Sequence, residues 1–523
     1  MNLPDSAAPP ALELRGIDKR FGTVHANRGV SLSIARGTIH GLIGENGAGK
    51  STLMNIVYGF QPADSGEIRV QGIPRVFGSP QDAIAAGIGM VHQHFMLVEN
   101  FTVLENIVLG VEGRRLIAPG LARARSALAA LARDYGLEVP LDALVSTLPV
   151  GLQQRVEILK ALYRGAEILI LDEPTAVLVP QEVEQLFRML GRLAGQGKTV
   201  ILVTHKLKEI MAVTSRVTVM RQGAVVAEVA TRETTPRDLA EKMVGRAVLL
   251  RVEKTPATAG AELLAVRDLE VVDAFGVARV KGVSFSLHAG EIVGVAGVAG
   301  NGQSELLEAL AGIRVPRRGE IRVAAAGGSP AGSDPRARRR LGLAHVPEDR
   351  LRMGVVAAFS AEHNAILGYH TLPEYNRGVL LDGDAVRGAC ERKMAGYDVR
   401  PANPRLPVSA FSGGNQQKLV MAREIESDPR VLLVGQPTRG VDIGAIEFIH
   451  RQLVGLRDAG KAVLLVSVEL DEIIGLSDRI LVMAGGEIIG ELSPQEATEE
   501  KLGLMMAGVR EMAEGGSRNP EGR

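Results

Sequence analysis

The sequence predicts an α/β fold that is built twice along one chain, and three observations point to it. Residues 44–51, Gly-Glu-Asn-Gly-Ala-Gly-Lys-Ser, match the phosphate-binding pattern G-x-x-x-x-G-K-[ST] at every fixed position. The glycine pattern at Gly44 recurs 253 positions later, at Gly297. Short apolar runs such as 168–171 end in polar residues, which is typical of central parallel strands. We therefore expect two α/β domains, each with a mostly parallel core sheet.

The internal repeat sets the predicted domain boundaries. We expect a first domain at 1–250, a loop-forming linker at 251–260, a second domain at 261–512 and a disordered tail at 513–523. Each copy then has about 250 residues, the size of an ordinary large α/β domain.

The composition excludes several classes of protein. The 523 residues carry 60 Lys and Arg against 60 Asp and Glu, so no basic field predicts a nucleic-acid partner. No apolar run approaches the roughly 20 residues that span a bilayer, and the N-terminus lacks a secretory signal pattern. One cysteine, Cys390, allows no intrachain disulfide, and we expect it to be a buried, inert thiol.

The phosphate-binding pattern lies between an apolar strand, 38–43, and the first turns of a helix from residue 52. Its glycines let backbone N–H groups surround a polyphosphate, to which the helix N-terminus adds a favourable dipole. Lys50 supplies a cation for the outer phosphates, and the Ser51 hydroxyl is suited to ligate Mg²⁺. The predicted ATP-binding residues of this stretch are Gly44, Glu45, Asn46, Gly47, Ala48, Gly49, Lys50, Ser51 and Thr52.

Polar side chains follow three further apolar runs in the first copy. Gln93 ends one run, Asp172 and Glu173 end another, and His205 ends a third. Ligands bind at the carboxyl ends of strands in open α/β sheets. We expect Asp172 to hold Mg²⁺ through water, Glu173 to polarise the attacking water, and Gln93 to touch the metal or that water. A solvated acidic turn and a structural histidine are the alternatives.

An aromatic residue, Phe21, lies between two β-like runs near the start of the chain. It is placed to stack on an adenine ring, and the alternative is an ordinary core phenylalanine.

The motifs together resemble the nucleotide-binding domain of ABC transporters, and the resemblance covers nearly the whole chain twice. The signature of that family is L-S-G-G-Q, and the second copy has it at 411–416 as Phe-Ser-Gly-Gly-Asn-Gln. The resemblance implies tandem P-loop NTPase domains of the ABC type, each with an antiparallel β subdomain and a helical insert. It also implies that Ser412, Gly413, Gly414 and Asn415 contact ATP, and that His205 bridges the γ-phosphate and Glu173.

The two copies differ at the positions that carry the chemistry. In the second copy Gln303, before Ser304, replaces the phosphate-loop lysine, and Glu348 stands at the position of Gln93. Gly435 and Gln436 replace the metal-holding and the water-polarising carboxylate, and Val468 replaces the histidine. The first copy instead has a damaged signature. Pro149 has no N–H to donate, and Val150 is bulky where glycine allows close approach.

These defects are complementary. ABC domains pair head-to-tail, so the first phosphate loop is expected to face the intact signature of the second copy. That pairing within one chain predicts one working ATPase site. The second predicted site is degenerate. It would combine Gln303, Gly435, Gln436 and Val468 of the second copy with Pro149 and Val150 of the first, and whether it still holds a nucleotide stays open.

The fused tandem arrangement is similar to the ATPase subunits of bacterial importers for nucleosides and simple sugars. The run 92–100 favours the nucleoside branch, with ribose, galactose or xylose as the alternative. The resemblance implies two integral-membrane permease subunits, an extracytoplasmic substrate-binding protein and a peripheral position on the cytoplasmic face of the inner membrane. The segments 95–110 and 355–368 are expected to contact the permeases. A soluble translation factor and an ATP-gated regulator are the other classes, which the short linker and the intact catalytic set disfavour.

Overall fold

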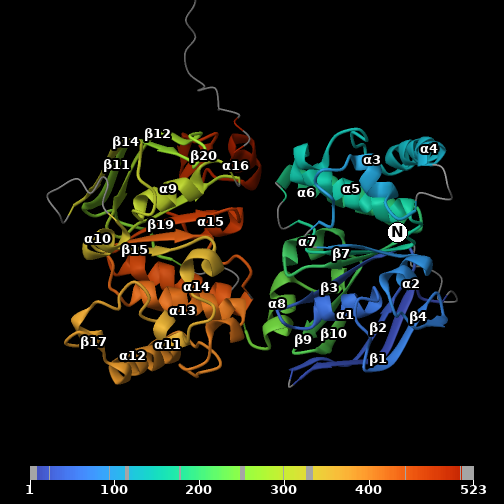
Figure 1. Ribbon diagram of the computed structural model, residues 1–523, viewed down its shortest axis with the longest axis horizontal. Coiled ribbons are helices and arrows are strands. Elements are labelled where there is room, and N and C mark those ends of the chain that lie inside the picture. The colour runs from blue at the N-terminus through green and yellow to red at the C-terminus, as the bar shows by residue number, and fades with distance from the viewer. Residues whose placement is uncertain are drawn as a thin grey trace, which may run out of the picture. The chain divides into compact units, whose positions relative to one another are not determined.

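The computed structural model describes residues 9–22, 24–92, 95–111, 117–175, 178, 180–247, 254–298, 300–324, 334–441, 443–506 and 508. The chain divides into two compact units, Met1–Leu250 and Arg251–Arg523 (Figure 1). Two of the sequence predictions, Gln93 and the tail 513–523, lie outside the described residues.

Unit 1 is built on two sheets. The first is antiparallel and has the strand order β2-β1-β4-β5, with β1 Leu12–Phe21, β2 Val24–Ile34, β4 Ser65–Val70 and β5 Ile73–Arg75. The second has the order β10-β9-β3-β8-β7-β6, with β3 Ile39–Gly44, β6 Ile88–Val91, β7 Ile168–Asp172, β8 Thr199–Val203, β9 Arg216–Arg221 and β10 Ala224–Ala230. All neighbours in the second sheet are parallel except β9 and β10. The carboxyl ends of β3, β7 and β8 therefore meet at one edge.

The helices of unit 1 follow the expected alternation with strands. They are α1 Lys50–Val57, α2 Pro80–Ala85, α3 Val103–Val108, α4 Ile117–Tyr135, α5 Val150–Tyr163, α6 Pro180–Gly195, α7 Leu207–Val213 and α8 Pro236–Val244. The predicted helical insert between 95 and 167 contains α3, α4 and α5. One buried cluster joins the antiparallel sheet, α1 and one face of the parallel strands, so the loop before α1 is held by packing on both sides.

Unit 2 repeats this architecture. Its antiparallel sheet has the order β12-β11-β14, with β11 Glu262–Val272, β12 Ala278–His288 and β14 Arg318–Val323. Its larger sheet has the order β15-β18-β19-β13-β20-β21, with β13 Ile292–Ala296, β15 Leu343–Val346, β18 Val431–Gly435, β19 Ala462–Ser467, β20 Arg479–Ala484 and β21 Glu487–Leu492. A short hairpin joins β16 Asn376–Arg377 to β17 Leu380–Leu381.

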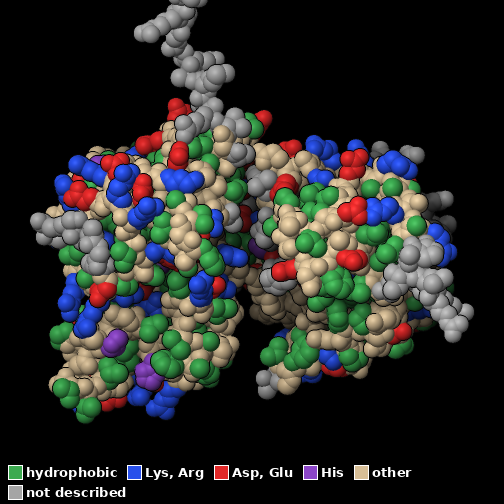
Figure 2. Space-filling view, turned by 45° about the horizontal axis from the view of Figure 1, so that its top comes forward, with side chains coloured by type: hydrophobic (Ala, Val, Ile, Leu, Met, Phe, Trp, Pro, Cys, Tyr) green, Lys and Arg blue, Asp and Glu red, His purple; other side chains and the backbone are tan. Residues whose placement is uncertain are grey.

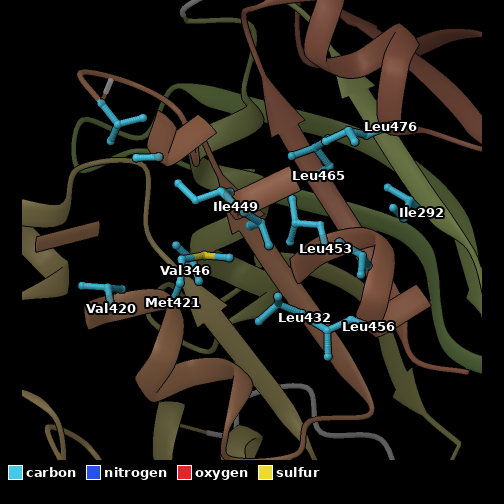
Figure 3. Close-up of a cluster of buried hydrophobic side chains, with 14 of the residues drawn as sticks. Ile292, Val346, Val420, Met421, Leu432, Ile449, Leu453, Leu456, Leu465 and Leu476 are labelled. Carbon is cyan, nitrogen blue, oxygen red and sulfur yellow. The ribbon is translucent and has the colours of Figure 1, made fainter. Parts of the chain in front are cut away.

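The α-helices of unit 2 are α9 Gln303–Leu310, α10 Pro335–Arg340, α11 Ala361–Asn364, α12 Gly383–Gly396, α13 Gly413–Ile425, α14 Ile443–Asp458, α15 Leu470–Leu476 and α16 Glu499–Met506. Strand β18 is buried on both faces. Because side chains alternate between the two faces of a strand, its residues belong to two different clusters. Leu432 and Val434 join the cluster under α13 and α14, whereas Leu433 joins the cluster under the antiparallel sheet. Figure 3 shows Leu432 and Leu465 of the sheet packed against Ile449 and Leu453 of α14.

The surface agrees with the balanced charge. Acidic and basic side chains are interspersed on the face shown in Figure 2, with hydrophobic side chains scattered between them. Among the described helices, none combines the length and the hydrophobicity that crossing a lipid bilayer requires. Cys390 is buried, as expected, and burial raises the pKa of its thiol to about 12.

Candidate functional site

The loop between β3 and α1 requires glycine at two positions where other backbone comes close. A Cβ on Gly44 would lie 2.3 Å from the carbonyl oxygen of Met220, and one on Gly49 would lie 2.3 Å from that of Ala26. Gly49 also has a φ of 97°, a left-handed conformation that side chains disfavour, and it is the N-cap of α1. The loop therefore presents backbone N–H groups at the N-terminus of α1, which is an anion-binding geometry.

Lys50 is buried at the start of this helix, with 6% of its surface exposed. Its Nζ donates to the carbonyl oxygens of Gly44 (2.7 Å) and Glu45 (3.1 Å), so the ammonium lies against the phosphate loop. Burial lowers the pKa of Lys50, and the carboxylates of Glu173 and Asp172 oppose that shift. A buried cation held mainly by neutral carbonyls is suited to a polyanionic ligand.

Asp172 ends strand β7 and is buried beside the start of α1. Burial raises its pKa, and a hydrogen bond from the Ser51 hydroxyl opposes that shift. A hydroxyl and a carboxylate are oxygen donors of the kind that Mg²⁺ prefers, and Mg²⁺ completes its shell with phosphate and water oxygens. Ser51 and Asp172 thus fit the predicted metal site, to which Gln93 cannot be added because it lies outside the described residues.

Glu173 and His205 form a pair at adjacent strand ends. The distance from His205 Nδ1 to Glu173 Oε1 is 2.8 Å, and both side chains are mostly buried. Glu173 has a φ of 48°, and its N–H donates to the carbonyl oxygen of Val203 at 2.8 Å. Burial raises the pKa of Glu173, but the hydrogen bond with His205 and the nearby Lys50 charge outweigh it, so the net pKa is lowered. The carboxylate is therefore ionised and oriented at neutral pH.

Four polar side chains that the sequence did not single out hold the turns after these strands. The hydroxyls of Thr175 and Thr204 both donate to the buried carboxylate of Glu209 in α7, the second at 3.2 Å. Gln154 Nε2 donates to the carbonyl oxygen of Pro174 at 2.7 Å, which ties α5 to the turn after Glu173. The position of Gln154 one helical turn inside the signature helix was the available signal.

A fifth residue that the sequence did not single out supports the phosphate loop directly. Asn27 is fully buried in β2, and its Nδ2 donates to the Gly49 carbonyl oxygen at 3.1 Å. Strand β2 mixes polar and apolar residues, and several of them are exposed, so the sequence held no signal that Asn27 is buried.

Phe21 is not a core residue. It is the last residue of β1, it is 44% exposed, and the Lys19 ammonium lies 5.5 Å from its ring centroid. The core alternative is therefore wrong, and the ring remains available for stacking. The other predicted loop residues, Glu45–Ala48 and Thr52, lie in the loop and in α1.

The two signature segments begin helices, but only one has a side-chain cap. Ser412 is the N-cap of α13, and its Oγ accepts hydrogen bonds from Asn415 N (3.4 Å) and Asn415 Nδ2 (2.8 Å). A Cβ on Gly413 would lie 2.4 Å from Arg350 Nη2. In unit 1 Pro149 is the N-cap of α5 without any side-chain hydrogen bond, and Val150 follows it with 41% exposure. The structure thus has the altered segment at the start of α5 and the Ser-Gly-Gly segment at the start of α13.

The phosphate loop of unit 2 keeps its backbone although its chemistry has changed. Gly302 is the N-cap of α9 with a φ of 97°, and its Cβ position is 2.1 Å from the Arg279 carbonyl oxygen. Gln303 is buried where Lys50 lies in unit 1. The structure also shows an arrangement that the sequence did not predict. The Ser304 hydroxyl donates to Glu348, whose Cγ lies 2.4 Å from the place of a Cβ on Gly435.

In unit 2 the residues at the positions of Glu173 and His205 are Gln436 and Val468, and both are uncharged. Gln436 has a φ of 47° and a backbone hydrogen bond to Val466 of 2.8 Å, so it repeats the backbone of Glu173. Its Oε1 accepts from the N–H of Val468 at 3.3 Å. An amide and a valine cannot orient water as an ionised carboxylate with a histidine does.

Comparison with known proteins agrees with this geometry. The family profile described as "ABC transporter" matches residues 27–176 and 280–439. The "Nucleoside import ATP-binding protein NupA" of Lactococcus lactis subsp. cremoris is 46% identical over 497 residues, which cover 95% of this chain and 98% of the relative. The "Guanosine import ATP-binding protein NupO" of Bacillus subtilis is 47% identical over 498 residues, covering 95% and 97%. The "Glucose import ATP-binding protein TsgD13" of Haloferax volcanii is 44% identical over 529 residues, covering 95% and 96%. The chain belongs to the ABC transporter family and is one of its ATP-binding, ATP-hydrolysing proteins.

Proposed function

We propose that the chain is the energy-coupling ATPase subunit of an importer for nucleosides. The observation that carries the ATPase part is the set of charged groups around one phosphate loop in unit 1: buried Lys50, Asp172 with Ser51, and the Glu173–His205 pair at 2.8 Å. The cargo part rests on the relatives named for nucleosides and guanosine, at 46% and 47% identity. Simple sugars are the alternative cargo, because a glucose relative is 44% identical.

The residues of unit 1 would act on ATP mainly by position and charge. Phe21 would stack on the adenine, the loop N–H groups and Lys50 would hold the phosphates, and Ser51, Asp172 and Gln93 would hold Mg²⁺. Bound there, Mg²⁺ would neutralise charge on the β- and γ-phosphates. The lowered pKa of Glu173 keeps it as a carboxylate that accepts a hydrogen bond or a proton from the attacking water. His205 fixes the orientation of that carboxylate.

The second half of the active site would come from the other copy. In the proposed head-to-tail pairing, Ser412, Gly413, Gly414 and Asn415 donate to the γ-phosphate held by unit 1. The support is chemical: α13 begins with a hydroxyl cap followed by two glycines, whereas Pro149 in α5 offers no N–H. One working ATPase site per chain follows from this pairing.

The partners of the proposed importer are two integral-membrane permease subunits and an extracytoplasmic substrate-binding protein. The chain would then lie at the cytoplasmic face of the cell membrane as a peripheral subunit. Support for a docking surface in unit 1 comes from exposed apolar side chains near the predicted segment 95–110. Phe60 is 45% exposed and its ring centroid lies 5.4 Å from that of His92, and Met96 is 62% exposed. Such side chains would become buried if a permease subunit packed against this segment.

Uptake measurements test the proposed cargo and the ATPase role together. Cells that lack the chain and carry a plasmid copy should take up radiolabelled guanosine, and unlabelled nucleosides should compete more strongly than ribose or galactose. The matched control is a plasmid copy with Glu173→Gln, which should support no uptake. Competition by sugars but not by nucleosides would overturn the cargo assignment, while uptake driven by the Glu173→Gln copy would overturn the ATPase role.

A further inference from the structure

The second phosphate loop has lost the carboxylate that holds the metal in the first, because Gly435 stands where unit 1 has Asp172. The space is nevertheless filled by a carboxyl-bearing side chain. Glu348, from the end of the neighbouring strand β15, passes 2.4 Å from the position that a Cβ on Gly435 would take. An aspartate at position 435 and the present Glu348 side chain could not both occupy this space. The glycine at the end of β18 and the Glu348 side chain after β15 therefore depend on one another sterically.

The carboxylate of Glu348 also repeats the contact of Asp172. In unit 1 the Ser51 hydroxyl donates to Asp172, and in unit 2 the equivalent Ser304 hydroxyl donates to Glu348. Both serines are the second residue of the helix after the phosphate loop, α1 and α9. The pair of oxygen donors that suits Mg²⁺ is thus present in both units, with its carboxylate supplied by a different strand in each.

A second, independent observation points to an anionic ligand at the same loop. Gln303 is 4% exposed, and its Nε2 has no hydrogen-bond partner among the residues that the structure describes. That nitrogen lies 2.5 Å from the Cβ position of Gly297, so it is aimed at the first glycine of the phosphate loop. In unit 1 the side chain at the equivalent position, Lys50, also turns toward the first glycine of its loop, but there Nζ donates to the Gly44 carbonyl oxygen at 2.7 Å. A buried amide N–H without a partner is unfavourable, and a phosphate oxygen would satisfy it.

The backbone of the loop and the neighbouring turn are also suited to a nucleotide. Gly302 has a φ of 97° and a ψ of 3°, against 97° and 4° for Gly49 in unit 1. Each unit has an exposed aromatic residue near the connection of its first two strands: Phe21 ends β1 and is 44% exposed, and Phe275 lies between β11 and β12 and is 91% exposed.

We propose that unit 2 retains a Mg²⁺-nucleotide site in which Ser304 and Glu348 ligate the metal and Gln303 donates to the phosphates. The site binds without turnover, because Gln436 and Val468 provide neither a base nor a histidine beside it. This inference rests on the proposed function only in requiring that the chain meets ATP, and it concerns the site to which that proposal assigns no catalysis.

Metal counting tests the proposal on the full-length chain. Glu173→Gln serves as the background that stops turnover, and Mn²⁺ with ATP serves as the probe, with bound Mn²⁺ counted by electron paramagnetic resonance. We expect two Mn²⁺ per chain in the background. Adding Glu348→Ala should weaken the second Mn²⁺ at least tenfold, in the range typical for a lost metal contact. The matched control is Glu305→Gln, which removes the same charge from the residue after Ser304 and should leave the count at two.

A rescue variant separates ligation from a merely structural role. Glu348→Ala removes the Cγ that crowds position 435, so the combined Glu348→Ala and Gly435→Asp variant can place a carboxylate where unit 1 has one. It should restore the second Mn²⁺. A count of one in the background, a count of two after Glu348→Ala, or failure of the rescue in a folded variant would each overturn the proposal. Adding Asp172→Asn removes the Mn²⁺ of unit 1 alone, so a failure there would count against the proposed function and not against this inference.

Discussion

Glu173 and Gln436 show what one residue contributes at this position. Both have a left-handed backbone, with φ of 48° and 47°, and both donate 2.8 Å hydrogen bonds to the next strand. The left-handed turn therefore belongs to the fold and does not depend on a carboxylate at this position. The difference between the two sites lies in the side chain: an ionised carboxylate paired with His205 in one, and an amide that accepts from a backbone N–H in the other.

Glu173→Gln is expected to stop turnover and to leave ATP binding intact. The amide keeps the size of the side chain and can still hydrogen-bond to His205, but it cannot accept a proton from water. A general base contributes about 10²–10⁴-fold, so steady-state phosphate release should fall by about that factor. Filter binding of labelled ATP checks that affinity is unchanged. Residual turnover above a tenth of the wild-type rate would refute the role.

Asp172→Asn should stabilise the protein while abolishing its activity. Because burial raises the pKa of Asp172, its contribution to stability is largest below the unfolded pKa and falls as pH rises through the folded pKa. At neutral pH the buried charge is therefore unfavourable, and asparagine should raise the free energy of unfolding by about 1 kcal/mol. Urea unfolding in the absence of nucleotide measures this, and a destabilised variant would contradict it.

The signature helices show the same contrast at the scale of an element. Helix α13 begins with a hydroxyl cap and two glycines, and helix α5 begins with a proline that has no side-chain hydrogen bond. Both helices nevertheless begin directly after the N-cap residue of the signature segment, α5 at Val150 and α13 at Gly413. The cap is thus dispensable for folding in one copy, which is consistent with a functional reason for Ser412 in the other.

Two substitutions of Ser412 separate capping from phosphate contact. Ser412→Ala removes the cap and should cost about 1 kcal/mol of stability. Ser412→Asp keeps a good N-cap but places a carboxylate against the proposed γ-phosphate. We expect both variants to lose ATPase activity and only the alanine variant to lose stability, as measured by phosphate release and thermal unfolding. An active aspartate variant would show that the hydroxyl does not meet a phosphate.

Strand β3 carries a buried histidine that makes unit 1 sensitive to acid. His40 is 1% exposed, its Nε2 lies 2.8 Å from Thr218 Oγ1, and burial lowers its pKa to about 4. A depressed folded pKa gives stability that is complete above the unfolded value of about 6.5 and is lost as pH falls toward 4. By about pH 5 the loss should be about 2 kcal/mol. Urea unfolding of wild type and His40→Gln at both ends of this range should show a flatter pH dependence in the variant.

The sequence predicted most of the fold at this scale for a physical reason. Runs such as 168–171 and 431–434 are apolar on both faces, which only a central strand between two layers satisfies. The strand-end positions of Asp172, Glu173 and His205 followed from that assignment. The sequence could not predict three features: the exposure of Phe21, the supporting roles of Asn27 and Glu209, and the position of the Glu348 side chain in the space beside Gly435. Each depends on which side chains meet across the sheet, and spacing along one strand does not contain that information.

At the scale of the whole molecule, the two units keep one topology and divide its chemistry. The strand orders β10-β9-β3-β8-β7-β6 and β21-β20-β13-β19-β18-β15 are equivalent. The carboxylate and histidine to which we assign catalysis lie in unit 1, and the intact signature lies in unit 2. We assign turnover to one site per chain, and to the phosphate loop of unit 2 a role that is limited to binding.

Vanadate trapping tests this assignment most directly, because only a site that hydrolyses ATP traps its product with vanadate. The full-length chain would be incubated with Mg²⁺, vanadate and 8-azido-ATP, illuminated and digested, and the labelled peptides would be identified by mass spectrometry. We predict that trapped label lies in unit 1, on peptides near Phe21 and residues 44–51, and that Glu173→Gln abolishes it. Vanadate-dependent label on the peptides of unit 2 around Phe275 and residues 297–304 would contradict the account.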